Sequence, residues 1–123
     1  MRHPDAGRVA KFAEASSVPV INGGDGPNEH PSQALLDLYT MRTEIAAQGQ
    51  SIDGLSIALI GDLRYGRAVH SLCKLLCLYD NIRLHLISPQ ELALPGDIVA
   101  LLKSAGHEAV SYTHLTLPTI LLV

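Results

Sequence analysis

Aromatic residues and long apolar runs are scarce in this sequence. Its 123 residues include one Phe, four Tyr and no Trp. No apolar stretch approaches the roughly 20 residues that a membrane-spanning helix needs, and no signal peptide is recognisable ahead of the first expected helix. These absences predict a cytoplasmic protein with no membrane partner.

An excess of one charge and a metal-binding pattern are also missing. Nine Lys and Arg against twelve Asp and Glu give a net charge of −3 without a basic run, which disfavours nucleic acid as a partner. Cys73 and Cys77 share one expected helix, but no His or carboxylate cluster completes a ligand set beside them, and the six histidines lack zinc-site spacing. We expect two buried thiols and no metal. Residues 61–66 lack the glycine spacing of a dinucleotide site, so we expect no cofactor.

What the sequence does contain is an alternation of helices with short apolar strands. The hydrophobic pattern predicts helices over 5–15, 31–48, 67–79 and 97–105, and strands over 18–21, 55–60 and 82–87. The strands at 18–21 and 55–60 are expected to be buried, the latter on both faces. This alternation predicts an α/β fold, a parallel sheet with flanking helices and right-handed crossovers.

The start of the helix over 31–48 combines two polar side chains with a proline. Pro31 suits the first helical turn, and Gly49 marks the expected end of this helix. His30 and Gln33 are three residues apart and share a face at the helix N-terminus, where an anion or a polarised carbonyl is favoured. On local grounds alone, an ordinary helix cap is the stronger interpretation.

Three motifs in a fixed order extend this interpretation. They are Met1-Arg2-His3-Pro4, Gly24-Asp25-Gly26-Pro27-Asn28-Glu29-His30-Pro31-Ser32-Gln33 and Gly61-Asp62-Leu63-Arg64-Tyr65-Gly66-Arg67. Over about residues 1–110 the sequence resembles the aspartate carbamoyltransferase catalytic chains. The resemblance implies parts of two domains. Residues 1–48 would be the C-terminal part of a carbamoyl-phosphate-binding domain, including a crossing helix, and residues 49–110 the N-terminal part of an aspartate-binding domain.

The resemblance also implies an activity and its site. The reaction is transfer of the carbamoyl group from carbamoyl phosphate to the amine of L-aspartate, in pyrimidine biosynthesis. Arg2 and His30 match catalytic residues that, with Gln33, contact carbamoyl phosphate. Arg67 matches the arginine that binds the aspartate carboxylate.

Other residues of the third motif are expected to shape the loop before the helix over 67–79. Asp62 and Arg64 are expected to organise this loop or the closed state of the site, and Gly66 to permit the turn. Tyr65 is expected to pack between the two halves of the chain.

The resemblance implies an assembly and a segment boundary as well. The family forms homotrimers of catalytic chains, to which regulatory chains can be added. The chain is expected to be an internal segment that is inactive alone, because further substrate-binding loops of the family are not in the sequence. Residues 111–123 are expected to be a non-native tail, since Val110 to Thr119 resembles a translated sequencing adapter.

Two alternatives remain at this stage. Ornithine carbamoyltransferase shares the His-Pro-x-Gln helix, but its substrate has a cationic side chain, and Arg67 favours a dicarboxylate. A noncatalytic α/β binding module would use His30 and Pro31 only as a helix cap.

Overall fold

A computed structural model gives the fold, and it describes residues 1–114. Its elements are α1 (Arg8–Glu14), α2 (Pro31–Ala46), β1 (Ser56–Ile60), α3 (Arg67–Leu76), β2 (Arg83–Ile87), the short 3-10 helix η1 (Gln90–Leu92), α4 (Gly96–Ser104) and β3 (Glu108–Tyr112). All four predicted helices are present with slightly shifted ends, and so are the strands predicted over 55–60 and 82–87. No helix within residues 1–114 is both long and apolar enough to cross a membrane.

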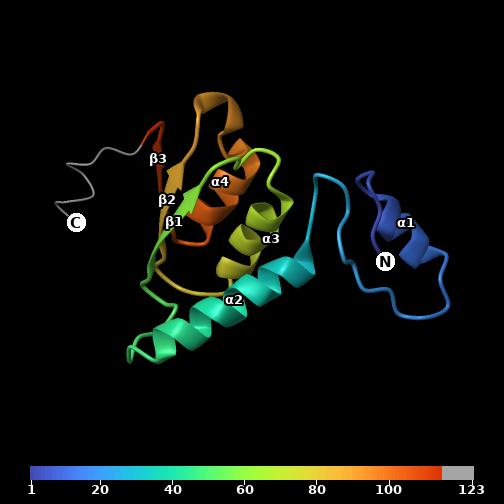
Figure 1. Cartoon of the computed structure of the whole chain (residues 1–123), viewed down its shortest axis with the longest axis horizontal. Helices are drawn as coiled ribbons and strands as arrows, with labels where there is room; N and C mark the ends of the chain where they lie inside the picture. The colour runs from blue at the N-terminus through green and yellow to red at the C-terminus, as the bar shows by residue number, and fades with distance from the viewer. Residues whose placement is uncertain (115–123) are drawn as a thin grey trace.

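The three strands form one parallel sheet in the order β1-β2-β3. Ser56 pairs with Arg83 at one end of the β1–β2 ladder and Ile60 with Ile87 at the other. Helix α3 connects β1 to β2, and α4 connects β2 to β3; both lie on the same side of the sheet (Figure 1). The predicted α/β class with a parallel sheet and flanking helices is confirmed.

The core lies between the sheet and its two crossover helices, and α2 packs against α3 from outside. Apolar side chains that alternate along β1 and β2 meet one face of α3, as a half-covered sheet requires. The side chains with under 2% exposure are Ala34, Leu63, Cys73, Leu76, Ile82, Leu84 and Leu102.

The expectation that β1 is buried on both faces is wrong. Ser56, Ala58 and Ile60 are exposed, and the Ile60 side chain retains 63% of its accessible surface. The physical reason is topological, because both crossover helices cover the same face of the sheet. Within residues 1–114, no element covers the other face of β1.

The strand predicted over 18–21 is also wrong. This segment forms no strand, and its Val18 and Ile21 side chains are 66% and 79% exposed. A strand needs a neighbour to complete its backbone hydrogen bonds, and the described chain places none beside residues 18–20.

The start of the segment that resembles an adapter is part of the sheet. Val110 to Tyr112 complete β3, with Tyr112 paired to Ile87. Of the predicted tail, residues 115–123 lie outside the described residues.

The N-terminal residues run beside the segment that leads into α2. Gly23 N–H donates to the Met1 carbonyl (2.7 Å), and His3 N–H donates to the Gly24 carbonyl (2.9 Å). His3 and Asp25 form a parallel bridge. Because these contacts join residues 1–3 to residues 23–25, the first two sequence motifs are neighbours in space. Helix α1 lies apart from the sheet, beyond the N-terminal end of α2 (Figure 1).

The two cysteines differ in burial. Cys73 is completely buried, whereas Cys77 is half-buried and its thiol donates to the Cys73 carbonyl (3.3 Å). The expectation of two buried thiols thus holds fully only for Cys73. Burial, and secondarily the neighbouring Cys77, raises the pKa of Cys73 to about 12. A thiol with this pKa stays protonated at neutral pH, so Cys73 is a packing residue rather than a nucleophile.

Candidate functional site

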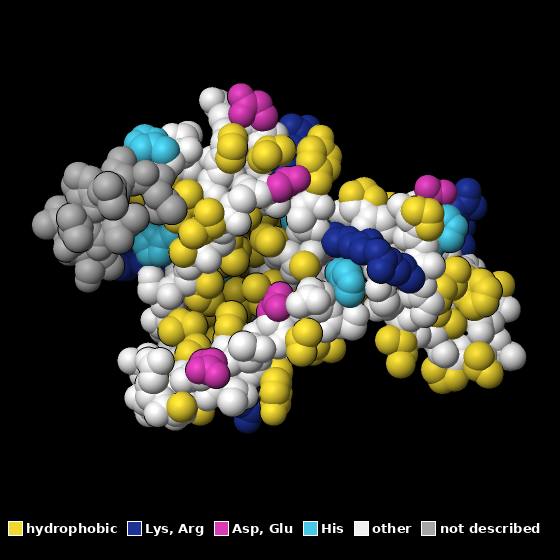
Figure 2. Space-filling model, viewed as in Figure 1, with side chains coloured by type: hydrophobic (Ala, Val, Ile, Leu, Met, Phe, Trp, Pro, Cys, Tyr) yellow, Lys and Arg dark blue, Asp and Glu magenta, His cyan; other side chains and the backbone are white. Residues whose placement is uncertain are grey.

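Two arginines that are distant in sequence converge on Gly24. A Cβ atom placed on Gly24 would lie 3.2 Å from Arg67 Nη1 and 3.3 Å from Arg2 Cγ. Gly24 has a φ of +140°, a backbone conformation that also disfavours a side chain. Figure 2 shows cationic side chains next to a histidine over the N-terminal end of α2. The fold therefore brings the first and third motifs to the second.

Arg67 reaches this position from the start of α3, directly after the loop that follows β1. Gly66 precedes the helix, and a Cβ atom there would lie only 2.5 Å from the Asp62 carbonyl oxygen, so the turn requires glycine as expected. Arg67 Nη1 donates to the Gly26 carbonyl (3.0 Å). This bond uses one of five guanidinium N–H donors and leaves others for an anion.

Asp62 organises this loop as predicted. Its Oδ1 accepts from the backbone N–H groups of Arg64 (3.1 Å) and Tyr65 (2.9 Å). The buried His70 ring on α3 also fixes this loop, because its Nε2 forms a hydrogen bond with the Leu63 carbonyl (2.9 Å). Tyr65 differs from its expected role. It is 58% exposed, and the Arg64 guanidinium lies over its ring, so most of its surface is not packed against the described chain.

His30 caps α2 with its own ring. Its Nδ1 accepts from Gln33 N–H (3.2 Å), while Ala34 N–H donates to the His30 carbonyl (3.2 Å) and Pro31 has no N–H. The capping interpretation is confirmed, and few helix N–H groups remain for an anion. Because Nδ1 accepts, the proton of the neutral ring sits on Nε2. The same ring that caps the helix thus presents a donor on its other side.

The Gln33 side chain is oriented by α2 itself. Its Nε2 donates to Asp37 Oδ1 (2.9 Å), one helical turn along. The amide oxygen therefore remains to accept a hydrogen bond from a ligand N–H.

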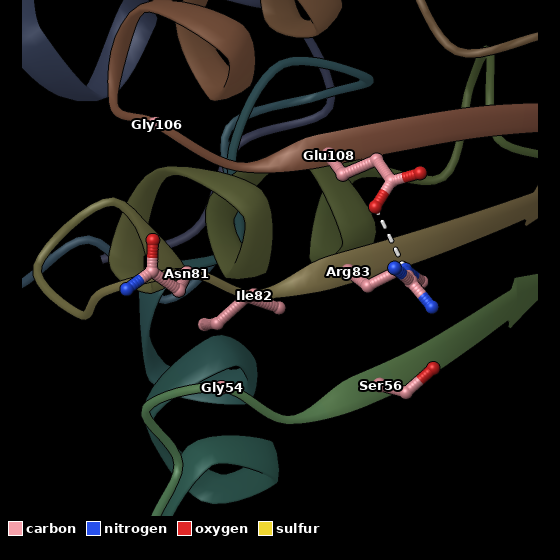
Figure 3. Close-up of a pocket in the computed structure, with 7 residues that line it drawn as sticks. All are labelled: Gly54, Ser56, Asn81, Ile82, Arg83, Gly106 and Glu108. Carbon is pink, nitrogen blue, oxygen red and sulfur yellow. Dashed lines mark hydrogen bonds and ion pairs between the residues drawn. The ribbon is translucent and has the colours of Figure 1, made fainter.

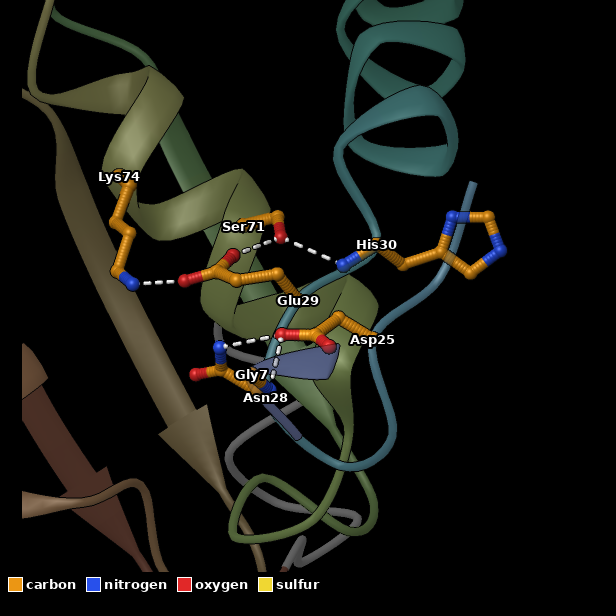
Figure 4. Close-up of polar contacts among 7 residues, drawn as sticks. All are labelled: Gly7, Asp25, Asn28, Glu29, His30, Ser71 and Lys74. Atoms are coloured by element: carbon orange, nitrogen blue, oxygen red, sulfur yellow. Dashed lines mark hydrogen bonds and ion pairs between the residues drawn. The ribbon is translucent and has the colours of Figure 1, made fainter. Parts of the chain in front are cut away.

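Sequence reasoning missed a second set of polar contacts behind His30. Ser71 Oγ accepts from His30 N–H (2.9 Å) and donates to Glu29, while Lys74 pairs with the other Glu29 oxygen (Figure 4). The His30 ring points away from this cluster. A signal was available, because Arg67, Ser71 and Lys74 are spaced by four and three residues and share one face of α3.

Asp25 ties this loop to α1. Its Oδ2 accepts from Asn28 Nδ2 and from Gly7 N–H, both at 3.0 Å, and the residue is 4% exposed. The hydrogen bond from Asn28 and then that from Gly7 hold the pKa of Asp25 below its ordinary value, although burial opposes them. The carboxylate form is therefore the one that anchors α1.

Acid should release this anchor. Because the folded pKa is depressed, the contribution of Asp25 to stability is present above the unfolded pKa, about 3.9, and is lost as pH falls below it. We expect the chemical shift of the Gly7 amide in the 123-residue chain to change as pH is lowered from 6 to 2, because an Asp carboxyl titrates within roughly this range. In Asp25→Asn this movement should disappear, whereas Asp53→Asn should leave it unchanged. An unaltered titration in Asp25→Asn would contradict the assignment.

The other end of the sheet has a pocket of different character. Figure 3 shows Ser56, Arg83 and Glu108 at the start of the three strands, with Arg83 Nε paired to Glu108 at 2.7 Å. The two charges neutralise each other, and ligands of open α/β sheets bind at the opposite, carboxyl ends of strands. Within residues 1–114, no group of three His, Cys, Asp or Glu side chains is arranged to hold a metal ion.

A comparison of the sequence with protein families indicates the class of protein to which this chain is similar. Residues 1–43 match the carbamoyl-phosphate-binding domain of the aspartate/ornithine carbamoyltransferases. This match covers Arg2, His30 and Gln33, and it ends within α2.

Individual relatives narrow the likeness to one member of that class. The aspartate carbamoyltransferase catalytic subunit of Cellvibrio japonicus is 66% identical over 108 residues, which cover 88% of this chain and 32% of the relative. The chain spans about a third of the length of this relative and of the catalytic subunits from Saccharophagus degradans and Dichelobacter nodosus.

Solved structures agree with the sequence matches. The catalytic subunit of Methanocaldococcus jannaschii aspartate transcarbamoylase has a TM-score of 0.81 and 47% identity, covering 93% of this chain and 36% of its own. The Trypanosoma cruzi enzyme, in complex with carbamoyl aspartate and phosphate, has a TM-score of 0.83 and 38% identity, covering 94% and 38%. The fold is therefore that of a segment of aspartate transcarbamoylase.

Proposed function

We propose that this chain is a segment of an aspartate carbamoyltransferase catalytic chain and carries part of its active site. The observation that carries the proposal is the convergence of Arg2 and Arg67 at Gly24, in the loop that leads to the His30 cap. Both guanidinium groups suit a pair of anionic substrates. The matches to aspartate carbamoyltransferases over most of the chain support the same conclusion.

Each side chain then has a chemical task. The aspartate amine attacks the carbonyl carbon of carbamoyl phosphate, and negative charge grows on the carbonyl oxygen. The bond from this carbon to the phosphate oxygen then breaks, and the amine proton leaves with the departing phosphate, which gives carbamoyl aspartate. His30 Nε2–H donates to that oxygen, and Arg2 binds carbonyl and phosphate oxygens. The Gln33 amide oxygen accepts from the carbamoyl N–H. Arg67 binds a carboxylate of aspartate. No covalent enzyme intermediate is needed, because positioning and charge stabilisation suffice.

The proposal includes a division of the chain and its assembly. Residues 1–48 belong to the carbamoyl-phosphate half, which the match over 1–43 supports, and residues 49–110 belong to the aspartate half. The family resemblance further predicts a homotrimer of catalytic chains, to which regulatory chains can be added. The cytoplasmic location and the non-native segment over 111–123 remain predictions from the sequence itself.

A chimeric subunit tests the proposal directly. In this chimera the 108 matched residues of our chain replace the corresponding segment of the Cellvibrio japonicus subunit. We expect the chimera to form carbamoyl aspartate from carbamoyl phosphate and aspartate, while the 123-residue chain alone shows no turnover.

Two outcomes would contradict this proposal. Preference of the chimera for ornithine over aspartate, measured side by side, would favour ornithine carbamoyltransferase. A folded chimera without either activity, beside an active parent subunit, would favour a noncatalytic binding module.

A further inference from the structure

We propose that Glu29, Ser71 and Lys74 form a clamp through which α3 sets the position of His30. This inference rests on the proposed function, because it assigns positioning residues to the same site. None of the three is expected to touch substrate. They lie on one side of the His30 backbone, and the His30 ring points away from them to the other side (Figure 4).

The hydroxyl of Ser71 is the direct link to His30. It accepts from the His30 backbone N–H (2.9 Å) and donates its single proton to Glu29. A serine hydroxyl has one donor and can accept as well, so the bond to Glu29 turns its lone pairs toward His30. Ser71 is only 5% exposed, which limits competition by water.

Glu29 is in turn held by two groups of α3. One carboxylate oxygen accepts from Ser71 and the other pairs with Lys74. The Glu29 side chain is 18% exposed and that of Lys74 is 48% exposed. Hydrogen bonds to an ionised carboxylate are stronger than neutral ones, so the ion pair fixes the acceptor on which the Ser71 hydroxyl depends.

His30 needs such support because its backbone is neither helix nor strand. Its φ and ψ are −141° and 73°, and its ring is held at Nδ1, by Gln33 N–H (3.2 Å) and by the Ser32 hydroxyl (3.3 Å). Loss of the Ser71 contact would free the backbone N–H and let the ring shift about these contacts at Nδ1. Arg67 begins the same helix, so α3 positions both the aspartate contact and the histidine.

The first test compares variants of the chimeric subunit. We expect Ser71→Ala to lower kcat roughly tenfold to a hundredfold, as a small misplacement of a catalytic group does. Ser71→Thr, which keeps the hydroxyl, should restore most of the loss. Lys74→Met removes the charge at a half-exposed position and should also lower kcat. Ser104→Ala removes a helix serine hydroxyl far from the site and should leave kcat unchanged.

The second test separates positioning from a merely structural role. In a His30→Ala background, with kcat measured per folded subunit, Ser71→Ala and Lys74→Met should cause no further loss. If Ser71→Ala lowers kcat by the same factor with and without His30, the clamp is contradicted. An unchanged kcat in the Lys74→Met chimera would contradict it as well. If His30→Ala alone leaves kcat unchanged, the proposed function itself fails, which is a distinguishable result.

Discussion

Replacing His30 with alanine in the chimeric subunit is expected to lower kcat by roughly 10² to 10³, the usual cost of removing one donor to a developing oxyanion. The reason is geometric. Nδ1 is committed to Gln33 N–H, so Nε2 is the nitrogen that carries the proton to a carbonyl oxygen. Steady-state kinetics with both substrates, per folded subunit, measure the effect.

Asparagine at position 30 distinguishes the two functions of this ring. Asn is an effective helix cap, so His30→Asn should retain the stability of α2 while losing the Nε2 donor. We expect its kcat to match that of His30→Ala, with a thermal midpoint close to the unmodified chimera. Recovery of kcat in His30→Asn would mean that capping alone matters at this position.

Replacing His107 with alanine is expected to cost about 3 kcal/mol or more of unfolding free energy, because two buried backbone groups lose their partners and a cavity opens. His107 is 5% exposed; its Nδ1 accepts from Ile82 N–H (3.1 Å), and its Nε2 donates to the Leu76 carbonyl (3.0 Å). It therefore joins the end of α3, the start of β2 and the turn after α4. Urea unfolding of the 123-residue chain, followed by circular dichroism, measures the loss.

A second histidine provides the matched control. His85 on β2 is half-buried on the uncovered face of the sheet, and its partners Ser56 and Tyr112 are exposed. His85→Ala should cost less than about 1 kcal/mol, since water can replace these contacts. Similar losses in the two variants would contradict the assigned role of His107.

The four helices and the strands β1 and β2 follow from local sequence patterns, but partners across the chain do not. The apolar spacing along α3 and the proline at the start of α2 predict both helices because their signals are local. The segment over 18–21 has strand-like composition, yet β structure depends on a neighbouring strand, which no local pattern reports. Burial of only one face of β1 likewise follows from the side on which both crossovers lie.

The site could be predicted in part. Arg2, His30, Gln33 and Arg67 were identified from their motifs, and the structure brings Arg2 and Arg67 together at Gly24. Their roles toward substrate remain predictions. The clamp does not follow from the motifs, because Glu29 lies in the second motif whereas Ser71 lies 42 residues later and outside all three. Only the shared face of Arg67, Ser71 and Lys74 on α3 pointed toward it.

The double use of the His30 ring limits how this position can change over evolutionary time. One nitrogen completes a helix, and the other is the donor that the proposed function assigns to the substrate. Under that proposal, a substitution has to replace an acceptor and a donor on opposite sides of one rigid group. Asn and Ser can cap but do not reach the far side, whereas Lys and Arg donate but cannot accept. A change at position 30 therefore has to be matched by changes elsewhere that restore both the cap and the donor.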